Sequence, residues 1–280
     1  MTYRFFDFEV ARTRRVSPSV QRVTFRGAKP GGLAEFASGG RDQRFKLFFA
    51  RKGQERALVP TEAGDDWYAS WRAMDPDERA YMRTYTVREQ RRELGEVDVD
   101  FAVHIGAGPA GDWALNALAG DRICALGPCV ADNAGIDFRP PRETDWILLA
   151  GDETALPAIA GILDWLGPGR VVRAWIEIGH SDDLQDLRTW ADAEITWLVR
   201  GAGRSLTGAI STARLPEGAL PYAWIAGEAA EVRTLRRHLV GARAEGGRGM
   251  DRDRVTFTGY WRRGASEEDL LAELVSAGSA

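Results

Sequence analysis

The sequence predicts two domains of different fold class: an N-terminal antiparallel β-barrel of six strands and a C-terminal α/β domain with a doubly wound parallel sheet. From Tyr3 to about Pro140, short stretches of alternating apolar residues are separated by clusters of Gly, Pro and Asp, as in small barrels. Beyond Pro140, continuous apolar stretches alternate with amphipathic ones, as in βαβ units. We therefore expect domains at residues 1–142 and 143–280.

The six barrel strands are each short and apolar on alternate positions. They are expected at residues 6–10, 20–27, 44–49, 82–88, 97–105 and 122–126. A long segment, residues 52–81, interrupts them and contains a helix-like piece at residues 65–72. This segment is typical of a surface excursion. Because it leads directly into the strand at 82–88, a flap beside a ligand is the alternative interpretation.

The second domain is expected to contain five strands and two clear helices. The strands are predicted at residues 145–150, 171–178, 194–199, 222–227 and 255–259, and the helices at 154–166 and 228–244. Residues 266–277 predict a terminal amphipathic helix, which would either pack on the domain or shape access to a ligand cleft. Parallel sheets bind ligands beyond the carboxyl ends of their strands, where Gly151 and Gly227 lie.

The composition excludes several functional classes. The formal net charge of −4 argues against non-specific nucleic-acid binding. No apolar stretch approaches the ~20 residues that span a bilayer, and the N-terminus lacks the apolar segment of a signal peptide. Two cysteines and three histidines are too few for a zinc site or an iron–sulfur cluster. We therefore expect a cytoplasmic protein, most simply a monomer, without a metal site.

The run Arg83-Thr84-Tyr85-Thr86-Val87-Arg88 is a candidate flavin clamp. In a strand, Arg83, Tyr85 and Val87 share one face, and Thr84, Thr86 and Arg88 share the other. Arg83 offers a planar fork of donors for a pyrophosphate, and Tyr85 offers a rigid aromatic face for the flavin ring or ribityl chain. Thr86 supplies a hydroxyl and an N–H group that could reach flavin N5. An ordinary surface strand explains these residues alone equally well.

Two glycine-containing turns are candidate phosphate sites. After a strand that ends at His104, Gly108 permits close backbone approach, and Pro109 and Ala110 could open a helix whose N-terminus favours phosphate. His104 fits both a cofactor contact and a histidine satisfied at a strand end. The turn at residues 151–157 lacks the G-x-G-x-x-G pattern, but it also precedes a helix and could face a pyrophosphate.

Together, these motifs resemble the siderophore-interacting protein family, within the ferredoxin-reductase-like flavoproteins. The matching segments are Arg83-Thr84-Tyr85-Thr86-Val87-Arg88, Gly108-Pro109-Ala110 with Trp113-Ala114, Gly151-Asp152-Glu153-Thr154-Ala155-Leu156-Pro157-Ala158-Ile159, Trp224-Ile225-Ala226-Gly227-Glu228 and Gly259-Tyr260-Trp261-Arg262-Arg263-Gly264. Their order and spacing cover nearly the whole chain, from about residue 5 to residue 264.

The resemblance implies a cytoplasmic ferric-siderophore reductase with an FAD-binding barrel and an NAD(P)H-binding α/β domain. The implied FAD contacts are Arg83, Thr84, Tyr85, Thr86, Val87, Arg88, His104, Gly108, Pro109, Ala110, Trp113, Thr154, Tyr260 and Trp261. The implied NAD(P)H contacts are Gly151, Asp152, Glu153, Thr154, Ala155, Gly227 and Glu228. Lys46, Arg44 and Arg262 would meet an anionic siderophore; Arg44 replaces a histidine that is frequent in relatives, and Asp112 replaces a basic residue.

The implied reaction passes a hydride from NADPH or NADH to FAD and then single electrons to chelated Fe(III). Arg200 and Arg204 follow the third strand of the second domain, where a 2′-phosphate could be met, and they leave the choice of nucleotide open. A ferredoxin is an alternative electron donor. The alternative functions are a general flavin or ferredoxin-type reductase with another acceptor, and a non-catalytic siderophore-binding flavoprotein.

Overall fold

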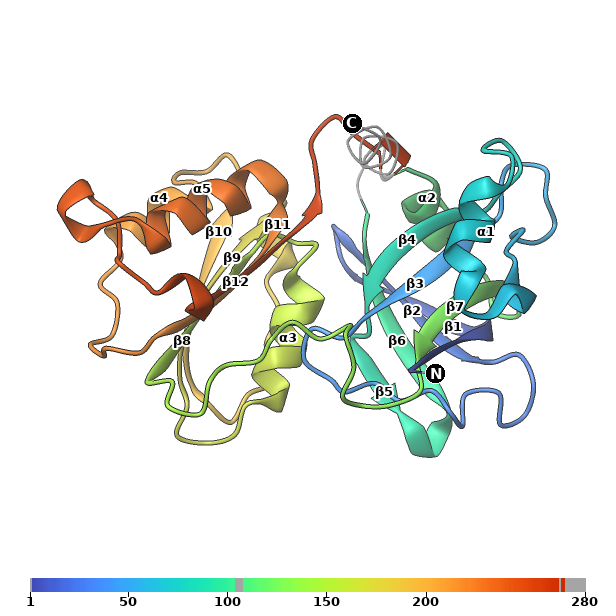
Figure 1. Ribbon diagram of the computed structural model, residues 1–280, viewed down its shortest axis with the longest axis horizontal. Helices are drawn as coiled ribbons and strands as arrows, with labels where there is room; N and C mark the ends of the chain where they lie inside the picture. Colours follow the sequence, from blue (N-terminus) through green and yellow to red (C-terminus); the bar gives the residue numbers. More distant parts are fainter. Residues whose placement is uncertain (1, 104–107, 267, 270–280) are drawn as a thin grey trace. The chain divides into compact units, whose positions relative to one another are not determined.

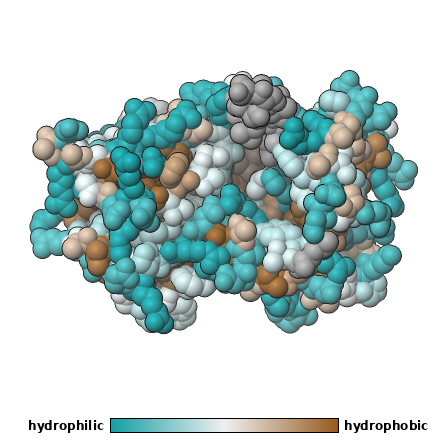
Figure 2. Space-filling view, viewed as in Figure 1, coloured by the Kyte–Doolittle hydropathy of each residue, from teal (hydrophilic) through white to brown (hydrophobic). Residues whose placement is uncertain are grey.

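The computed structural model describes residues 2–103, 108–266 and 268–269. The chain forms two compact units, Met1–Ile136 and Asp137–Ala280, each with its own hydrophobic core (Figure 1). The predicted division of the chain between residues 142 and 143 stays a prediction. In Figure 2 the visible surface is mostly hydrophilic with isolated apolar residues, as in most globular proteins. Among the described residues, no helix is long and apolar enough to cross a bilayer.

The first unit is an antiparallel, barrel-like sheet, as the sequence predicts. Its strands are β1 (Tyr3–Ser17), β2 (Val20–Gly27), β3 (Arg44–Phe49), β4 (Tyr81–Thr86), β5 (Glu89–Arg91), β6 (Glu96–Ala102) and β7 (Arg122–Pro128). Their order in the sheet is β4-β3-β7-β1-β2-β6-β5. The described residues therefore form seven strands rather than six. The additional strand, β5, has three polar residues and no apolar alternation that would reveal it.

The core of this unit is largely aromatic. Phe8 lies at its centre, with ring centroids 5.3 Å from Phe25 and 6.0 Å from Phe45. The helix α2 (Gly108–Asn116) adds Trp113, which stacks on Phe25 at 6.1 Å and meets Phe49 edge-on at 5.4 Å. These contacts fix α2 against the barrel, so its N-terminus is held at a defined place.

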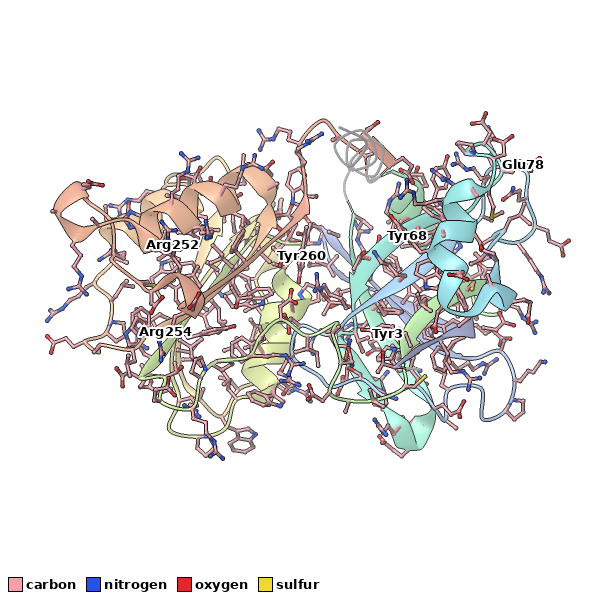
Figure 3. The ribbon with its side chains drawn as sticks, viewed as in Figure 1. Tyr3, Tyr68, Glu78, Arg252, Arg254 and Tyr260 are labelled. Atoms are coloured by element: carbon pink, nitrogen blue, oxygen red, sulfur yellow. The ribbon has the colours of Figure 1, made fainter. Side chains whose placement is uncertain are left out.

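The excursion between β3 and β4 packs on the outer face of these strands. It contains a 3₁₀ helix (Thr61–Asp66) and α1 (Trp67–Ala73). Trp67 meets Phe48 edge-on at 5.9 Å, and Trp71 is buried and donates to the Ala80 carbonyl at 3.2 Å. Tyr68, labelled in Figure 3, stacks on Trp71. The excursion therefore packs at the Phe48 end of β3, and Thr84 on β4 stays exposed.

The second unit is a parallel five-stranded sheet in the order β10-β9-β8-β11-β12. The strands are β8 (Trp146–Gly151), β9 (Val171–Ile178), β10 (Asp192–Val199), β11 (Tyr222–Glu228) and β12 (Val255–Trp261). The helices are α3 (Leu156–Trp165), α4 (Leu206–Thr212) and α5 (Ala229–Val240). Short 3₁₀ helices lie at Arg92–Leu94 in the first unit and at Ser181–Asp183, Arg243–Glu245 and Arg252–Arg254 in the second. The predicted α/β class is confirmed.

The central strand β8 is buried along its whole length because helices cover both faces of the sheet (Figure 1). Ile147 and Leu149 belong to the core beneath α3, whereas Leu148 and Ala150 belong to the core beneath α4 and α5. The short α4 was not predicted; Ser205 caps it by accepting a hydrogen bond from the Gly208 N–H. The helix expected at residues 266–277 lies largely outside the described residues.

Candidate functional site

The predicted flavin clamp lies on β4, an edge strand of the barrel sheet. Its pairing with β3 places Arg83 opposite Leu47 and Tyr85 opposite Phe45, on the face that points to the core. Thr84 lies opposite Lys46 on the other face. The strand therefore has the predicted alternation.

The two side chains on the inner face of β4 are half-buried and packed on aromatic residues. The Tyr85 ring lies 4.4 Å from the Phe101 ring, and the Arg83 guanidinium lies 5.6 Å from the Tyr81 ring centroid. Arg83 Nη1 also donates to the Met82 carbonyl at 2.9 Å. These contacts restrict both side chains to a narrow range of orientations, which suits a group that must receive a rigid ligand.

The chain that follows β4 is anchored by its backbone. Thr86 and Val87 are buried, and the Val87 N–H donates to the Gln43 carbonyl at 2.8 Å. The Arg88 N–H donates to the Asp98 carbonyl at 2.9 Å, which connects the clamp to β6. The backbone of Arg88, the second arginine of the motif, is therefore fixed to the sheet.

The start of α2 is the second part of the candidate flavin site. Gly108 has a φ of +76°, and a Cβ added at this position would meet no atom within 4 Å, so the turn is open on that side. Pro109 is exposed, Ala110 is buried, and Trp113 packs in the barrel core. His104 lies outside the described residues. The guanidinium groups of Arg83 and Arg88 and the N-terminus of α2 are the kinds of donor that suit a pyrophosphate, and the Tyr85 ring suits the ring system of FAD.

A network of charged side chains supports the strands behind the clamp. Asp98, which is 3% exposed, accepts hydrogen bonds from Arg91 at 2.8 and 2.7 Å and from Thr24 Oγ1 at 2.6 Å. Arg22 bonds both oxygens of Asp100 at 2.6 and 2.7 Å. Burial disfavours ionised Asp98, but the bonds from Arg91 and Thr24 outweigh this effect and keep its pKa below the usual value.

In the second unit, the expected nicotinamide turn joins β8 to α3. Gly151 ends β8, and a Cβ added to it would lie 2.7 Å from the Ala226 carbonyl oxygen, so only glycine fits there. Thr154 donates to Asp152 Oδ1 through its N–H at 2.9 Å and through its hydroxyl at 2.5 Å. Ala155 is buried. Hydrogen bonds between Thr154 and Asp152 therefore fix the conformation of this turn.

Asp152 connects this turn to the ends of two other strands. Its Oδ2 accepts from the Glu228 N–H at 2.9 Å and from Trp261 Nε1 at 2.7 Å. The residue is 6% exposed, and a Cβ added to Gly227 would lie 2.6 Å from Oδ2. Burial raises the pKa of Asp152 above its usual value. The geometry makes Asp152 a positioning residue for the ends of β11 and β12.

Glu228 and Arg204, predicted to contact NAD(P)H, and Tyr260, predicted to contact FAD, lie at or after the carboxyl ends of strands of the same sheet. Glu228 caps α5 by accepting from the Ala230 N–H at 2.7 Å and the Glu231 N–H at 3.0 Å. Tyr260, labelled in Figure 3, meets Trp224 edge-on at 6.4 Å. Arg204 donates to Thr212 Oγ1 at 2.8 Å.

Arg200, predicted to meet a 2′-phosphate, is held by two carboxylates. Its Nη1 donates to Glu153 Oε1 at 2.8 Å, Nη2 donates to Glu153 Oε2, and Nε donates to Glu177 Oε1 at 2.8 Å. The sequence reasoning missed Glu177. Apart from Arg173, Glu177 is the one charged residue in the strand at 171–178, and its position next to the carboxyl end of the strand was the signal that could have identified it.

The residues implied for siderophore contact come from both units. Lys46 and Arg44 lie two residues apart and therefore share one face of β3. Lys46 Nζ donates to Thr84 Oγ1 at 2.7 Å. Arg262, in the second unit, forms an isolated antiparallel bridge with Ala265. A cavity of about 1270 Å³ lies elsewhere in the barrel unit, between the excursion and β1 and β7; residues 83–88 do not line it.

Comparisons with known proteins agree with this arrangement. Residues 9–132 match the siderophore-interacting FAD-binding domain, and residues 144–264 match the siderophore-interacting protein family. Ferric vibriobactin reductase ViuB of Vibrio cholerae is 31% identical over 269 residues, which cover 95% of this chain and 91% of that protein. The NADPH-dependent ferric-chelate reductase of Escherichia coli is 29% identical over 265 residues, which cover 92% of this chain and 93% of that protein.

A solved structure agrees along almost the whole chain. The crystal structure of a siderophore utilization protein from T. fusca superposes with a TM-score of 0.76 at 30% identity and covers 95% of both chains. The two matched segments correspond to the barrel unit and the parallel-sheet unit in the order described above. The chain therefore belongs to the siderophore-interacting protein family and carries its FAD-binding domain.

Proposed function

We propose that this protein is an FAD-dependent oxidoreductase that takes electrons from NADH or NADPH and reduces Fe(III) held in a siderophore. Membership of the family supports the proposal, as do the functions in the names of two relatives, a ferric vibriobactin reductase and an NADPH-dependent ferric-chelate reductase. Fe(II) binds hard oxygen ligands much less tightly than Fe(III), so reduction releases the metal from the chelate.

The barrel unit would hold FAD through the residues of the clamp. Arg83 and Arg88 would bind the pyrophosphate together with the N-terminus of α2, and Tyr85 would lie against the ring system or ribityl chain. Bound FAD supplies the conversion between a two-electron donor and a one-electron acceptor. The protein's own contribution is to position the donor and the acceptor and to set the local charge.

The observation that carries the proposal is the register of β3 against β4. It sets Lys46 directly beside Thr84, on the face of β4 opposite to Arg83 and Tyr85, with Arg44 two residues along the same face of β3. Two cations beside a flavin clamp favour an anionic acceptor. Ferric siderophores are commonly anionic, whereas a neutral acceptor would gain nothing from this charge.

The second unit would bind the nicotinamide nucleotide at the carboxyl edge of its sheet, beside the turn at 151–155 and the start of α5. NADH and NADPH are reductants of the cytoplasm, so the proposed reaction implies a cytoplasmic protein. A ferredoxin as the physiological donor is tested by the same measurements, because it would reduce the flavin where both nucleotides fail.

Anaerobic stopped-flow spectroscopy tests the proposal. The purified protein should be yellow, NADH or NADPH should bleach its flavin absorbance, and ferric siderophores should restore it while an Fe(II)-specific chelator traps the product. Reoxidation by other acceptors but by no ferric chelate would favour the general reductase. Siderophore binding without bleaching by any donor would favour the non-catalytic flavoprotein.

The chain offers a matched pair of variants for the acceptor side. Lys46→Ala should raise KM for anionic ferric chelates about tenfold, as expected for losing one charged contact worth roughly 1.4 kcal/mol. It should leave flavin reduction by the nucleotide and reduction of neutral chelates unchanged. Lys29→Ala removes an exposed lysine from the turn after β2 and serves as the control. An equal fall in flavin reduction would contradict the role given to Lys46.

A further inference from the structure

Three charged side chains meet at the carboxyl ends of three adjacent parallel strands. Glu153 follows β8, Glu177 is the penultimate residue of β9, and Arg200 follows β10. The register supports this meeting, because Leu198 pairs with Glu177 and the Arg200 N–H donates to the Ile178 carbonyl at 2.9 Å. We call Glu153, Arg200 and Glu177 the edge cluster.

The edge cluster fixes the guanidinium from two sides. Glu153 takes both terminal nitrogens of Arg200 in a fork, and Glu177 takes Nε, so three of its five N–H groups have carboxylate acceptors. The Glu153 side chain is only 10% exposed and that of Glu177 19%. The bonds from Glu153 raise the pKa of Arg200 above its usual value. Two carboxylates and one guanidinium leave the cluster with a net charge of −1.

The location of the cluster relates it to the nucleotide. Ligands of open parallel sheets bind beyond the carboxyl ends of the strands, where an acidic side chain typically accepts from the ribose 2′-hydroxyl of NAD and an arginine accommodates the 2′-phosphate of NADP. The edge cluster contains both residue types, but its arginine is already matched by two acids. The only other charged residue that the sequence marked for a 2′-phosphate, Arg204, donates to Thr212 instead.

We propose that Glu153 and Glu177 make this site select NADH over NADPH. A 2′-phosphate, which carries about two negative charges at neutral pH, would have to displace a carboxylate from Arg200 or lie beside the net negative cluster. Displacement would leave a mostly buried acid without its cation, which is costly. NADH requires neither change, and a carboxylate of the cluster can accept from its 2′-hydroxyl. The inference rests on the proposed function, since it concerns the nucleotide that donates the electrons.

Two measurements on the FAD-loaded full chain test this selection. Calorimetry compares binding of ADP-ribose with that of its 2′-phosphate, and stopped-flow bleaching compares kcat/KM for NADH and NADPH. We expect the unphosphorylated ligand to be favoured at least about tenfold in both. Failure of both nucleotides to bleach the flavin would refute the proposed function, whereas the calorimetric ratio would still report the selection.

Variants separate the contribution of the cluster from general effects. Glu153→Gln/Glu177→Gln should reduce the preference about tenfold, chiefly by tightening binding of the phosphorylated ligand. Glu194→Gln is the control. Glu194 on β10 pairs with Arg173 on β9 at 3.1 Å, but its side chain is 71% exposed and lies near the amino ends of these two strands. Its ratio should equal that of the unmodified protein.

Arg200→Gln keeps the inference testable if the double variant does not fold. It leaves both acids in place, so discrimination against the phosphorylated ligand should increase several-fold. A preference of the unmodified protein for NADPH, or a weaker discrimination after Arg200→Gln, would overturn the inference, because either result would mean that Arg200 is available to the 2′-phosphate.

Discussion

In the two units of this protein, buried carboxylates have different kinds of partner, and the candidate nucleotide sites beside them have opposite charge. In the barrel unit, Asp98 is paired with Arg91 and Thr24, and the candidate flavin clamp beside it is cationic. In the parallel-sheet unit, the described donors to the Asp152 carboxylate are the neutral groups of Thr154, Glu228 and Trp261, and the neighbouring edge cluster is net acidic. Accordingly, the pKa of Asp98 is lowered and that of Asp152 is raised.

This difference shows two uses for a buried acid. Asp98 balances arginines that would otherwise face one another across β2, β5 and β6, so its role is electrostatic. Asp152 accepts hydrogen bonds from donors at the ends of three strands, so its role is to hold these ends together. These bonds only partly offset the cost of burying its charge. The comparison can be tested in each unit separately. Hydrogen exchange of peptides from each unit is the appropriate measurement, because two units need not unfold together.

The largest effect is expected at Asp98. Asp98→Ala removes the buried carboxylate that is bonded to Arg91 and lies 3.9 Å from Arg22. This change should lower the free energy of unfolding of the barrel unit by about 3 kcal/mol. This is the low end of the range for a broken buried ion pair, because the side chains of Arg91 and Arg22 keep 20% and 16% exposure. Asp7→Ala, at an exposed pair with Arg122, should change stability by less than about 0.5 kcal/mol. Equal losses would contradict an electrostatic role for Asp98.

Removal of the clamp arginine should weaken FAD binding rather than the fold. Arg83→Ala should raise the Kd for FAD about a hundredfold, because a charge-assisted bond to a phosphate is worth roughly 1.5–3 kcal/mol. Arg83→Lys should recover only part of this, since lysine lacks the planar fork. Fluorescence titration of the apoprotein with FAD measures both. Arg14→Ala, at an exposed position of β1, is the control, and the same loss there would exclude a specific contact.

The sequence predicts most of the strands in the two units but not all of their elements. Apolar alternation and continuous apolar stretches identify the barrel strands and the parallel strands because burial dictates them. Residues 83–86 of the motif show the predicted alternation in β4, which ends at Thr86, whereas Val87 and Arg88 lie beyond the strand. By contrast, β5 has no apolar pattern, and α4 is too short for one.

The pairings among charged residues were the least predictable part. The sequence marks Asp152 and Arg200 as nucleotide contacts, yet the structure occupies Asp152 with four hydrogen bonds and Arg200 with two carboxylates. Such partners come from strands that are far apart in sequence, as with Glu153 and Arg200, which are 47 residues apart. Local pattern contains no information about them, because only the order of strands in the sheet brings them together.

A smaller loss of stability is expected at Asp152. Asp152→Ala leaves the donors of Thr154, Glu228 and Trp261 without an acceptor and should destabilise the parallel-sheet unit by about 2 kcal/mol. Trp261→Phe removes only one of these bonds and should cost about 1 kcal/mol. Hydrogen exchange at the ends of β11 and β12 reports both. Asp192→Ala, at the exposed start of β10, should have no effect, and an effect confined to α3 would contradict the bridging role.

The smallest and most discriminating effect is the dependence of stability on pH. Because the pKa of Asp98 is lower in the folded protein, its contribution is complete above the pKa of an unfolded aspartate, about 3.9, and is lost as the pH falls through the folded value. Because the pKa of Asp152 is raised, its contribution has the opposite sign: stability falls as the pH rises from about 3.9 through the folded value.

Isosteric variants isolate these slopes. Asp98→Asn should remove part of the acid sensitivity of the barrel unit, and Asp152→Asn should remove part of the loss that the parallel-sheet unit shows on raising the pH. Each slope is at most about 1.4 kcal/mol per pH unit, the limit for one proton. Exchange measured from about pH 3 to pH 7 and corrected for intrinsic rates gives both slopes in one sample. Slopes of the same sign would mean that the neutral donors around Asp152 stabilise its charge as fully as Arg91 stabilises that of Asp98.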